Sequence, residues 1–205
     1  TSIASSNALQ SFGLLAVLHI PFYGQAILGF LLMDVTFYWW HWANHRIKVL
    51  WRFHNVHHVD PDLDVSTSFR FHMGEIMYSS VFRAVQVGLI GITPVIYIIY
   101  EFIFTCATMF HHSNLKLPVT FERVLNAVFV TPRMHGIHHS DIQAETNSNY
   151  SVIFSWWDRL HGTINLHVPQ SKIRIGVPGY RDESDNTIKK LLIMPFVRQK
   201  PYWPE

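Results

Sequence analysis

The chain has 205 residues, of which 49% are hydrophobic, 15% aromatic and only 15% charged. Soluble domains usually carry about 25% charged residues, so this composition indicates a protein that contacts lipid. The net charge of +2 and the scattered basic residues do not favour nucleic acid as a partner. The single cysteine, Cys106, excludes a disulfide framework and a thiolate metal site.

The N-terminal segment is long and apolar enough to cross a bilayer. Residues 1–33 contain no Asp, Glu, Lys or Arg, and a crossing needs about 20 apolar residues. We therefore predict a membrane helix over about 11–35, which Pro21 can kink. The segment has no basic n-region and does not start with Met, which favours a membrane helix of a trimmed chain over a signal peptide.

A polar stripe follows at the end of this helix. Asp34, Tyr38, His41 and His45 recur at helical spacing and share one face. Asp34 is a candidate hydrogen-bond partner for an imidazole N–H, and the alternative is an interfacial carboxylate that only reaches water. Tryptophans and then basic residues come next, which indicates the cytoplasmic end of the helix by the positive-inside tendency. These basic residues are Arg46, Lys48 and Arg52.

The apolar segment over residues 75–111 admits two interpretations. A hydropathy window places a single crossing over 84–100, which would leave the histidines on either side of it on opposite faces of the membrane. A hairpin folded at Gly91 to Pro94 instead gives two helices of about 18 residues and about 27 Å each. We predict the hairpin, with membrane helices over about 75–90 and 92–111, because it keeps the histidines together. Arg83 must then face protein or extend toward the membrane surface.

The rest of the chain is predicted to form a cytoplasmic cap over about 41–72 and 112–205. Residues 119–130 have the apolar spacing of an amphipathic helix at the membrane interface. Thr131 and Pro132 have the chemistry of a helix start, so a helix should follow them. The sequence thus predicts an all-α fold in one domain, 1–205: an integral membrane helical bundle with a cytoplasmic histidine-rich helical cap.

Histidines gather in four short clusters. When neutral imidazoles pack together, their acceptor nitrogens face one another, and when they are protonated, their like charges repel. A bound cation that accepts the lone pairs is therefore the simplest stabiliser. One histidine pair alone is equally well explained by hydrogen bonds to water or backbone, but ten clustered histidines are not. The clusters are His41 and His45; His54, His57 and His58; His111 and His112; and His135, His138 and His139, which repeat the spacing of the second cluster.

An ordered set of motifs resembles the fatty acid hydroxylase / sterol desaturase superfamily. Each motif is short, but the ordered series is specific and covers residues 30–180. The series comprises His41-x3-His45, His54-x2-His57-His58, Phe69-Arg-Phe-His-x-Gly-Glu75, His112-Ser-Asn114, Thr131-Pro-Arg-Met-His-x2-His138-His139, Asn147-x-Asn-Tyr150 and Trp157-Asp-Arg-Leu-x-Gly-Thr163.

The resemblance implies a non-haem di-iron enzyme of the membrane that uses O2 to hydroxylate or desaturate a lipid, sterol-like or acyl. His111 adjoins the family's position, which leaves the choice between His111 and His112 open. Carried over by motif, the implied metal ligands are His41, His45, His54, His57, His58, His112, His135, His138 and His139. Candidate residues behind the ligands are Asp34, His72, Glu75, Asn114, Asn149 and Asp158, with a structural role as the alternative for His72.

The chemistry implied for these residues needs redox metals, because side-chain acids and bases do not break unactivated C–H bonds. The sequence has no nucleotide-binding loop, haem motif or iron–sulfur cysteines, so we expect an external electron donor: a cytochrome b5-like protein, a ferredoxin or a reductase. The rival hypothesis is a non-catalytic metal-binding membrane protein or metal carrier. We further expect the polar end of the lipid near Asn149, Tyr150 and Trp157.

Overall fold

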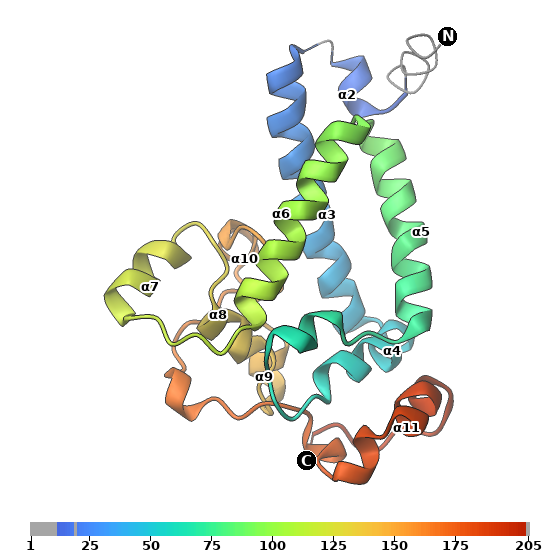
Figure 1. The fold of residues 1–205 in the computed structure, drawn as a ribbon, viewed down its shortest axis with the longest axis vertical. Coiled ribbons are helices and arrows are strands. Elements are labelled where there is room, and N and C mark those ends of the chain that lie inside the picture. Colours follow the sequence, from blue (N-terminus) through green and yellow to red (C-terminus); the bar gives the residue numbers. More distant parts are fainter. Residues whose placement is uncertain (1–11, 19, 204–205) are drawn as a thin grey trace.

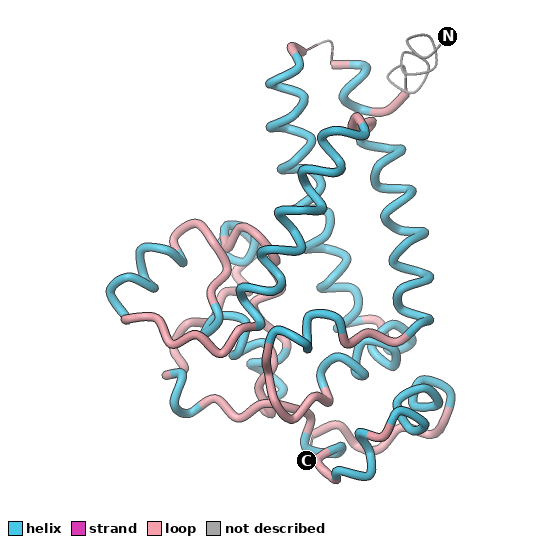
Figure 2. Tube along the Cα trace, in the orientation of Figure 1, coloured by secondary structure: helices cyan, strands magenta, loops and turns pink. Residues whose placement is uncertain are grey.

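The computed structural model describes residues 12–18 and 20–203. Within these residues every regular element is a helix, and strand-like pairing is limited to two isolated bridges, Phe129 with Phe154 and Ser140 with Ile175. The predicted all-α class is confirmed for this part of the chain. Three long helices extend along the long axis of the molecule, and the shorter helices, apart from the first, gather around one end of them (Figures 1 and 2).

The first predicted helix, over about 11–35, is divided in the structure. A short helix α2 (Leu14–Val17) precedes the long helix α3 (Phe22–Arg46), and Pro21 is the N-cap of α3. Proline has no N–H to donate and disfavours helical backbone in the residue before it, so the chain breaks here and is not merely kinked. Residues 11 and 19 lie outside the described part of the chain. The second half of α3 carries the polar stripe toward the histidine end.

Helix α4 (Lys48–His58) follows α3 after a single extended residue, Ile47. That residue has φ −94° and ψ 111°, which ends α3 and turns the chain so that α4 packs back on the end of α3. A loop and the 3₁₀ helix η1 (Val65–Phe69) then lead to the hairpin. Asp64 caps η1 through a capping box with Thr67, which fixes this connection beside the histidines.

Helices α5 (Met73–Ile90) and α6 (Pro94–His112) form the predicted two-helix hairpin. Gly91 ends α5 in the left-handed region at φ 77°, and Thr93 caps α6, with Pro94 as its first residue. The single helix suggested by a hydropathy window is therefore wrong. Both helices pack on α3, and they separate from each other toward the histidine end (Figure 1).

Short helices close the histidine end. Helix α7 stops before residue 130, the predicted end, because the chain turns at Ala127 and Phe129 bridges to Phe154. The helix predicted after Thr131 is present, with Thr131 as its N-cap. The elements are α7 (Val119–Asn126), α8 (Pro132–His138), α9 (Gln143–Thr146), α10 (Trp156–His161), η2 (Gln170–Lys172), η3 (Pro178–Tyr180), η4 (Glu183–Asn186), α11 (Ile188–Ile193) and η5 (Met194–Phe196).

Two apolar cores hold these helices in place. One joins α3 to the hairpin and to Val152 and Ile153, with Met33 and Tyr100 completely buried in it. The other packs α4, through Trp51, on the C-terminal segment. The first core thereby fixes α3 and α6 and the second fixes α4, three of the helices that carry the histidines.

Candidate metal centre

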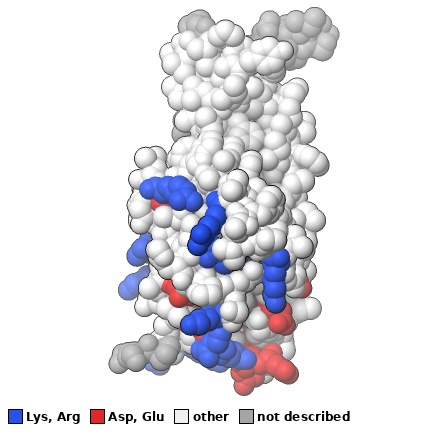
Figure 3. Space-filling view, turned by 90° about the vertical axis from the view of Figure 1, so that its left-hand side faces the viewer, with Lys and Arg blue, Asp and Glu red and all other residues white. Residues whose placement is uncertain are grey.

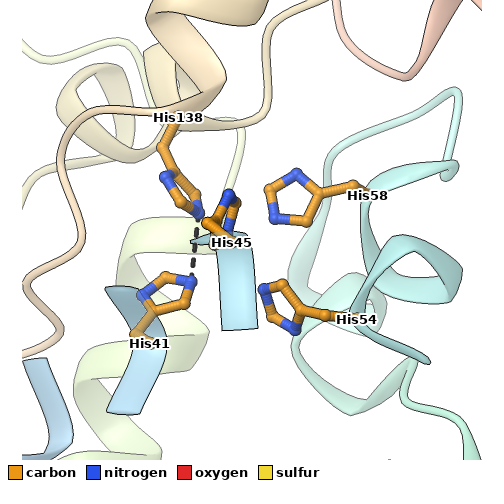
Figure 4. Close-up of side chains that lie close together, drawn as sticks. All are labelled: His41, His45, His54, His58 and His138. Atoms are coloured by element: carbon orange, nitrogen blue, oxygen red, sulfur yellow. Dashed lines mark hydrogen bonds between the residues drawn. The ribbon is translucent and has the colours of Figure 1, made fainter. Parts of the chain in front are cut away.

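Nine buried histidines meet where the C-terminal ends of α3, α4 and α6 approach α8. They form two groups, and within each group one ring nitrogen per residue lies within 4.8 Å of the others. Figure 4 shows the rings of one group arranged around a common space. The first group is His41, His45, His54, His58 and His138; the second group is His57, His112, His135 and His139.

The helical spacing explains why α4 and α8 serve both groups. On α4, His54 and His58 are one turn apart and belong to the first group, whereas His57 belongs to the second. On α8, His138 belongs to the first group, and His135 and the C-cap residue His139 belong to the second. Residues one turn apart lie on one helix face, and an adjacent residue is rotated away by about 100°. The two groups are therefore neighbours that share two helices.

Backbone carbonyls fix the tautomer of three of these histidines. The Nδ1 atoms of His41 and His138 lie 2.7 Å from the carbonyl oxygens of Tyr150 and Ser148. Nδ1 of His112 lies 2.8 Å from the carbonyl of Thr108 within α6. A carbonyl oxygen can only accept a hydrogen bond, so each Nδ1 carries the proton and each Nε2 presents a lone pair.

These Nε2 lone pairs face one another. The Nε2 atoms of His41 and His138 are 3.1 Å apart, along the dashed line of Figure 4. In the second group, Nε2 of His112 lies 3.2 Å from that of His57 and 3.1 Å from that of His135. Two nitrogens that bind one ion at about 2.1 Å and about 90–110° are about 3.0–3.4 Å apart, so both groups fit a metal ion.

Burial keeps these imidazoles neutral and thus able to bind a metal. It lowers the pKa of His41 to about 3 and the pKa of His112 to about 4. Repulsion between neighbouring imidazoles adds to burial at the other positions. The pKa is lowered well below its usual value at His45, His57, His58, His135, His138 and His139.

Several of the nitrogens have no hydrogen-bond partner among the described residues. Both ring nitrogens of His45 and of His58 are buried without one, and so is Nε2 of His54. An unpaired polar atom in the interior costs about 1–3 kcal/mol, and three such side chains in one space are a large cost for a cluster with a purely structural role. A cation that accepts their lone pairs removes that cost.

Of the candidate residues behind the ligands, Glu75 contacts the ring of a ligand histidine directly. Oε1 of Glu75 lies 2.7 Å from Nδ1 of His54, and both side chains are buried. The contact orients the His54 ring with Nε2 toward the first group. His111 stays outside both groups, with its Nδ1 3.2 Å from the carbonyl of Val152, so the geometry favours His112 over His111 as a ligand.

The carboxylates predicted behind the site support loops. Asp158 accepts hydrogen bonds from the backbone N–H groups of Tyr150 and Ser151, which holds the carbonyl of Tyr150 against His41. Burial raises the pKa of Asp158 despite these bonds. Asp34 accepts hydrogen bonds from the Trp157 indole at 2.7 Å and from the Phe154 N–H. Its hydrogen bonds thus go to the α10 region and not to an imidazole.

The remaining candidates have structural contacts. His72 caps α5 by accepting the Gly74 N–H, and its Nε2 lies 3.0 Å from the Leu192 carbonyl. Asn149, in the left-handed region at φ 56°, joins α8 to the loop at Asn165 through its side-chain amide. Asn114 is exposed two residues beyond α6. None of these three belongs to either histidine group.

Several parts of the site have no recognisable pattern in the sequence. The carbonyls of Thr108, Ser148 and Tyr150 carry no side-chain signature, so only the fold identifies them as partners of histidines. Phe71 stacks on His57, with ring centroids 4.5 Å apart and an angle of 13° between the planes. An aromatic residue close before Glu75 was visible in the sequence, but its orientation was not.

A cavity of about 640 Å³ lies between α3, α5, α6 and η1 and reaches the histidines. His41 and His54 of the first group and His57, His112 and His135 of the second line one part of it. Its other walls are mainly apolar. Asn149, Tyr150 and Trp157 do not line it, so the cavity does not support the place predicted for the polar end of a lipid, which stays a prediction. The space lies on the hairpin side of the histidines, because α5 and α6 separate there.

Comparison with known proteins identifies relatives whose names describe enzymes that act on lipids. The chain is 29% identical to an ornithine lipid hydroxylase of Rhizobium tropici over 159 residues, which is 78% of this chain and 47% of that protein. It is 30% identical to an alkylglycerol monooxygenase of Danio rerio over 66% of this chain and 29% of that protein. It is 26% identical to a cholesterol 25-hydroxylase of Homo sapiens over 65% of this chain and 48% of that protein.

These relatives are longer than the present chain, which spans about half of their length or less. No solved structure gave a significant match. Residues 26–163 match the sequence profile of the fatty acid hydroxylases, and this range contains all nine histidines of the two groups. The chain therefore belongs to the fatty acid hydroxylase family.

Proposed function

We propose that this protein is an O2-dependent di-iron oxidoreductase of the membrane that hydroxylates or desaturates a lipid. The observation that carries the proposal is the opening of a largely apolar cavity onto both histidine groups. Iron, when bound, supplies the redox chemistry that activates oxygen, which no side chain of the chain can supply. The names of the relatives, a hydroxylase and a monooxygenase, favour hydroxylation over desaturation.

The protein's own residues would hold the two ions, orient the imidazole rings and enclose the lipid chain. Neutral imidazoles provide the nitrogens for two ions, while Glu75 and three backbone carbonyls fix the ring orientations. The apolar walls admit a hydrocarbon chain, with about 0.8 kcal/mol gained for each CH2 removed from water. Phe71, which stacks on His57, and Val152 line the cavity beside the histidines and present apolar surface there. A carbon of the lipid can thus approach the ions along apolar walls.

Membrane insertion of the long helices is part of the proposal. Among the described helices, α6 alone is long and apolar enough by composition to cross a membrane, and most of its surface faces outward. Apolar side chains of α5, such as Met77, Val81 and Leu89, are also exposed. On the face seen in Figure 3, the charged residues lie around the histidine end, and the part formed by the opposite ends of the long helices shows none. A lipid environment explains both observations.

Helix α7 supports the same orientation. Two of its polar residues, Glu122 and Asn126, are buried, whereas Val119, Phe121 and Val124 are exposed together with Thr120 and Arg123. Glu122 pairs inward with Arg133 at 2.8 Å. A helix with its apolar face outward suits the membrane interface, so α7 marks the level at which the three long helices enter the bilayer. Arg46, Lys48 and Arg52 at the same end favour its cytoplasmic side.

The lipid reaction also needs electrons from outside the chain. Hydroxylation of one C–H bond consumes one O2, two electrons and two protons and releases one water. We propose an external donor, such as a cytochrome b5-like protein, a ferredoxin or a reductase, that approaches the cytoplasmic end. A non-catalytic metal carrier would explain the histidine groups but gives no role to the apolar cavity that reaches them.

The proposal is tested with iron-loaded protein in nanodiscs, a reductase and ¹⁸O2, followed by mass spectrometry of the lipids. We expect a lipid that carries ¹⁸O, or a lipid that has lost two hydrogens without label if the reaction is desaturation. His57→Ala should abolish the product, whereas His167→Ala, at an exposed histidine outside both groups, should not. Product formation without oxygen, or full activity in His57→Ala, would contradict the proposal.

A further inference from the structure

The cavity contains a charged pair on the hairpin-turn side of the histidines. Arg83 of α5 and Glu101 of α6 both line it, and Nε of Arg83 lies 3.0 Å from Oε1 of Glu101. The two residues bridge the gap where the hairpin helices separate. The Arg83 side chain is 14% exposed and that of Glu101 33% exposed. Charges at this depth of a membrane helix are costly, and those that occur usually have a functional role.

The surroundings hold the guanidinium of Arg83 in place. Nη1 donates to Oε1 of Gln86 at 2.7 Å, and Gln86 in turn donates to the Met33 carbonyl and to Thr36 on α3. Three aromatic rings lie 4.8–5.3 Å from the guanidinium carbon, which adds cation–π attraction. These rings belong to Phe37, Tyr100 and Phe104. The cation is therefore fixed by the scaffold before any lipid binds.

The pair nevertheless keeps unused hydrogen-bonding capacity. Oε1 of Glu101 is buried against the Arg83 guanidinium, whereas a third of the Glu101 side chain is exposed, so its second oxygen, Oε2, is the one that can accept a hydrogen bond from the cavity. A guanidinium offers five N–H donors, more than the contacts to Gln86 and Glu101 use. The wall thus presents both a donor and an acceptor to the cavity. Only a group that itself donates and accepts can satisfy both.

We propose that Arg83 and Glu101 bind a neutral hydroxyl or amide group of the lipid, which orients the lipid in the cavity. The group accepts a hydrogen bond from Arg83 and donates one to Glu101. An anionic headgroup does not fit as well, because the carboxylate of Glu101 repels it, and a plain hydrocarbon leaves the remaining donors of Arg83 and the second oxygen of Glu101 without partners. This inference rests on the proposed lipid oxidation and specifies its substrate class.

The position of the pair also sets a distance. Arg83 is about two turns beyond Glu75 on α5, roughly 12 Å at 1.5 Å per residue. Glu101 is about three turns before His112 on α6, roughly 16 Å by the same rise. A lipid held at the pair therefore presents to the histidines a carbon remote from its polar group. Oxidation should fall at that remote position and not beside the hydroxyl or amide.

The test uses four probes with a hexadecyl chain: the primary alcohol, the primary amide, the alkane and the alkyl phosphate. Each probe carries bromine at one end of the chain, which in the three polar probes is the end opposite the polar group. Trp40 lines the cavity and stacks on Phe82, next to Arg83 on α5, so a bromine carried into the cavity by a bound probe should quench its fluorescence. Trp40→Phe identifies the part of the signal that arises in the cavity. Binding is measured on iron-loaded protein in detergent, independently of turnover.

The informative variant is Arg83→Leu/Glu101→Leu, because removing one charge alone leaves the other buried and unpaired and can prevent folding. We expect it to bind the alcohol and the amide about tenfold more weakly or worse, and the alkane with unchanged affinity. Cys106→Ser, at an exposed residue of α6 that does not line the cavity, should bind all probes like the wild type. Iron content and thermal midpoint verify that each variant is folded.

Equal weakening of alcohol and alkane in the double variant would overturn the inference, and so would unchanged binding of the alcohol. A wild type that binds the phosphate most tightly would also overturn it, since the pair would then bind an anion. If no probe quenches Trp40 in the wild type, the proposed lipid cavity fails together with this inference. If the probes bind as expected but are never oxidised, the proposed function fails while the binding site stands.

Discussion

At His54, the Glu75 carboxylate has the position that backbone carbonyls have at His41, His112 and His138. All four contacts involve Nδ1, so all four rings direct Nε2 to the centre. A carboxylate differs from a carbonyl because its charge also makes the imidazole a stronger donor to a metal. Glu75 is therefore the one side chain among these four that a substitution can probe without changing the backbone.

Glu75→Leu should lower the affinity for iron about 10–100-fold, because His54 loses the partner that orients it. Glu75→Gln keeps an oxygen acceptor in the same place and should retain most of the affinity. The two variants are compared by the iron left after competition with a chelator. Equal losses in both would mean that the hydrogen-bond acceptor is not what Glu75 contributes.

The depressed pKa values of the histidines predict how the metal-free protein responds to acid. An imidazole that titrates at about 6.5 when unfolded titrates at about 3 in folded His41 and about 4 in folded His112. Unfolding therefore takes up protons below pH 6.5, so this part of the stability is complete above that pH and is lost as the pH falls.

We expect the thermal midpoint of metal-free protein in detergent to fall between about pH 6.5 and 5, where most Asp and Glu side chains are still ionised. A midpoint that is constant across this interval would contradict buried neutral imidazoles. Iron should leave the protein over the same interval, because protons compete for the ring nitrogens.

The residues of the site were more predictable than their contacts. All nine histidines expected as ligands lie in the two groups, because imidazoles at repeated helical spacing leave a clear pattern in the sequence. The partners of their Nδ1 atoms were predictable only at Glu75. The helical spacing gives α4 and α8 two histidine faces each, but which histidines of the other helices join each face depends on tertiary packing.

At the scale of elements, the hairpin turn depends on Gly91. Its φ of 77° is a conformation that side chains rarely adopt, and a Cβ there would lie 2.4 Å from the Phe12 carbonyl oxygen. Gly91→Ala should therefore destabilise the protein by about 1–3 kcal/mol. Gly88, inside α5 with open space around its Cβ position, is the matched control.

Gly88→Ala should be neutral or stabilise by up to about 1 kcal/mol, since alanine is the better helix former. The thermal midpoints of both variants and of the wild type measure the difference. A Gly91→Ala variant as stable as Gly88→Ala would show that the turn does not require the left-handed conformation.

The helices themselves were predicted with uneven success. Composition and turn chemistry correctly predicted α5, α6 and the connection at Gly91 to Thr93. The division at Pro21 was underestimated as a kink, although proline effects are local and visible in sequence. The sequence could not predict that α7 buries Glu122 and Asn126 and exposes its apolar face. The apolar spacing identifies that face but does not say whether protein or lipid covers it.

At the scale of the whole molecule, the proposed topology places α3, α5 and α6 across the bilayer with the histidine end in the cytoplasm. Cysteine labelling tests it in a Cys106→Ser background, because Cys106 is exposed. Asn114→Cys and His167→Cys should react with an impermeant maleimide only from the cytoplasmic side. Val95→Cys, exposed beside the hairpin turn, should react only from the other side. Labelling of positions 95 and 114 from one side would rule out the crossing of α6.

Counting iron decides whether the two histidine groups hold two ions. Elemental analysis of purified protein should give about two iron ions per chain in the wild type. His138→Ala, in the first group, and His57→Ala, in the second, should each lower that number, because each removes a nitrogen that faces its group. A wild type with a single iron, or variants that keep as much iron as the wild type, would contradict the di-iron site.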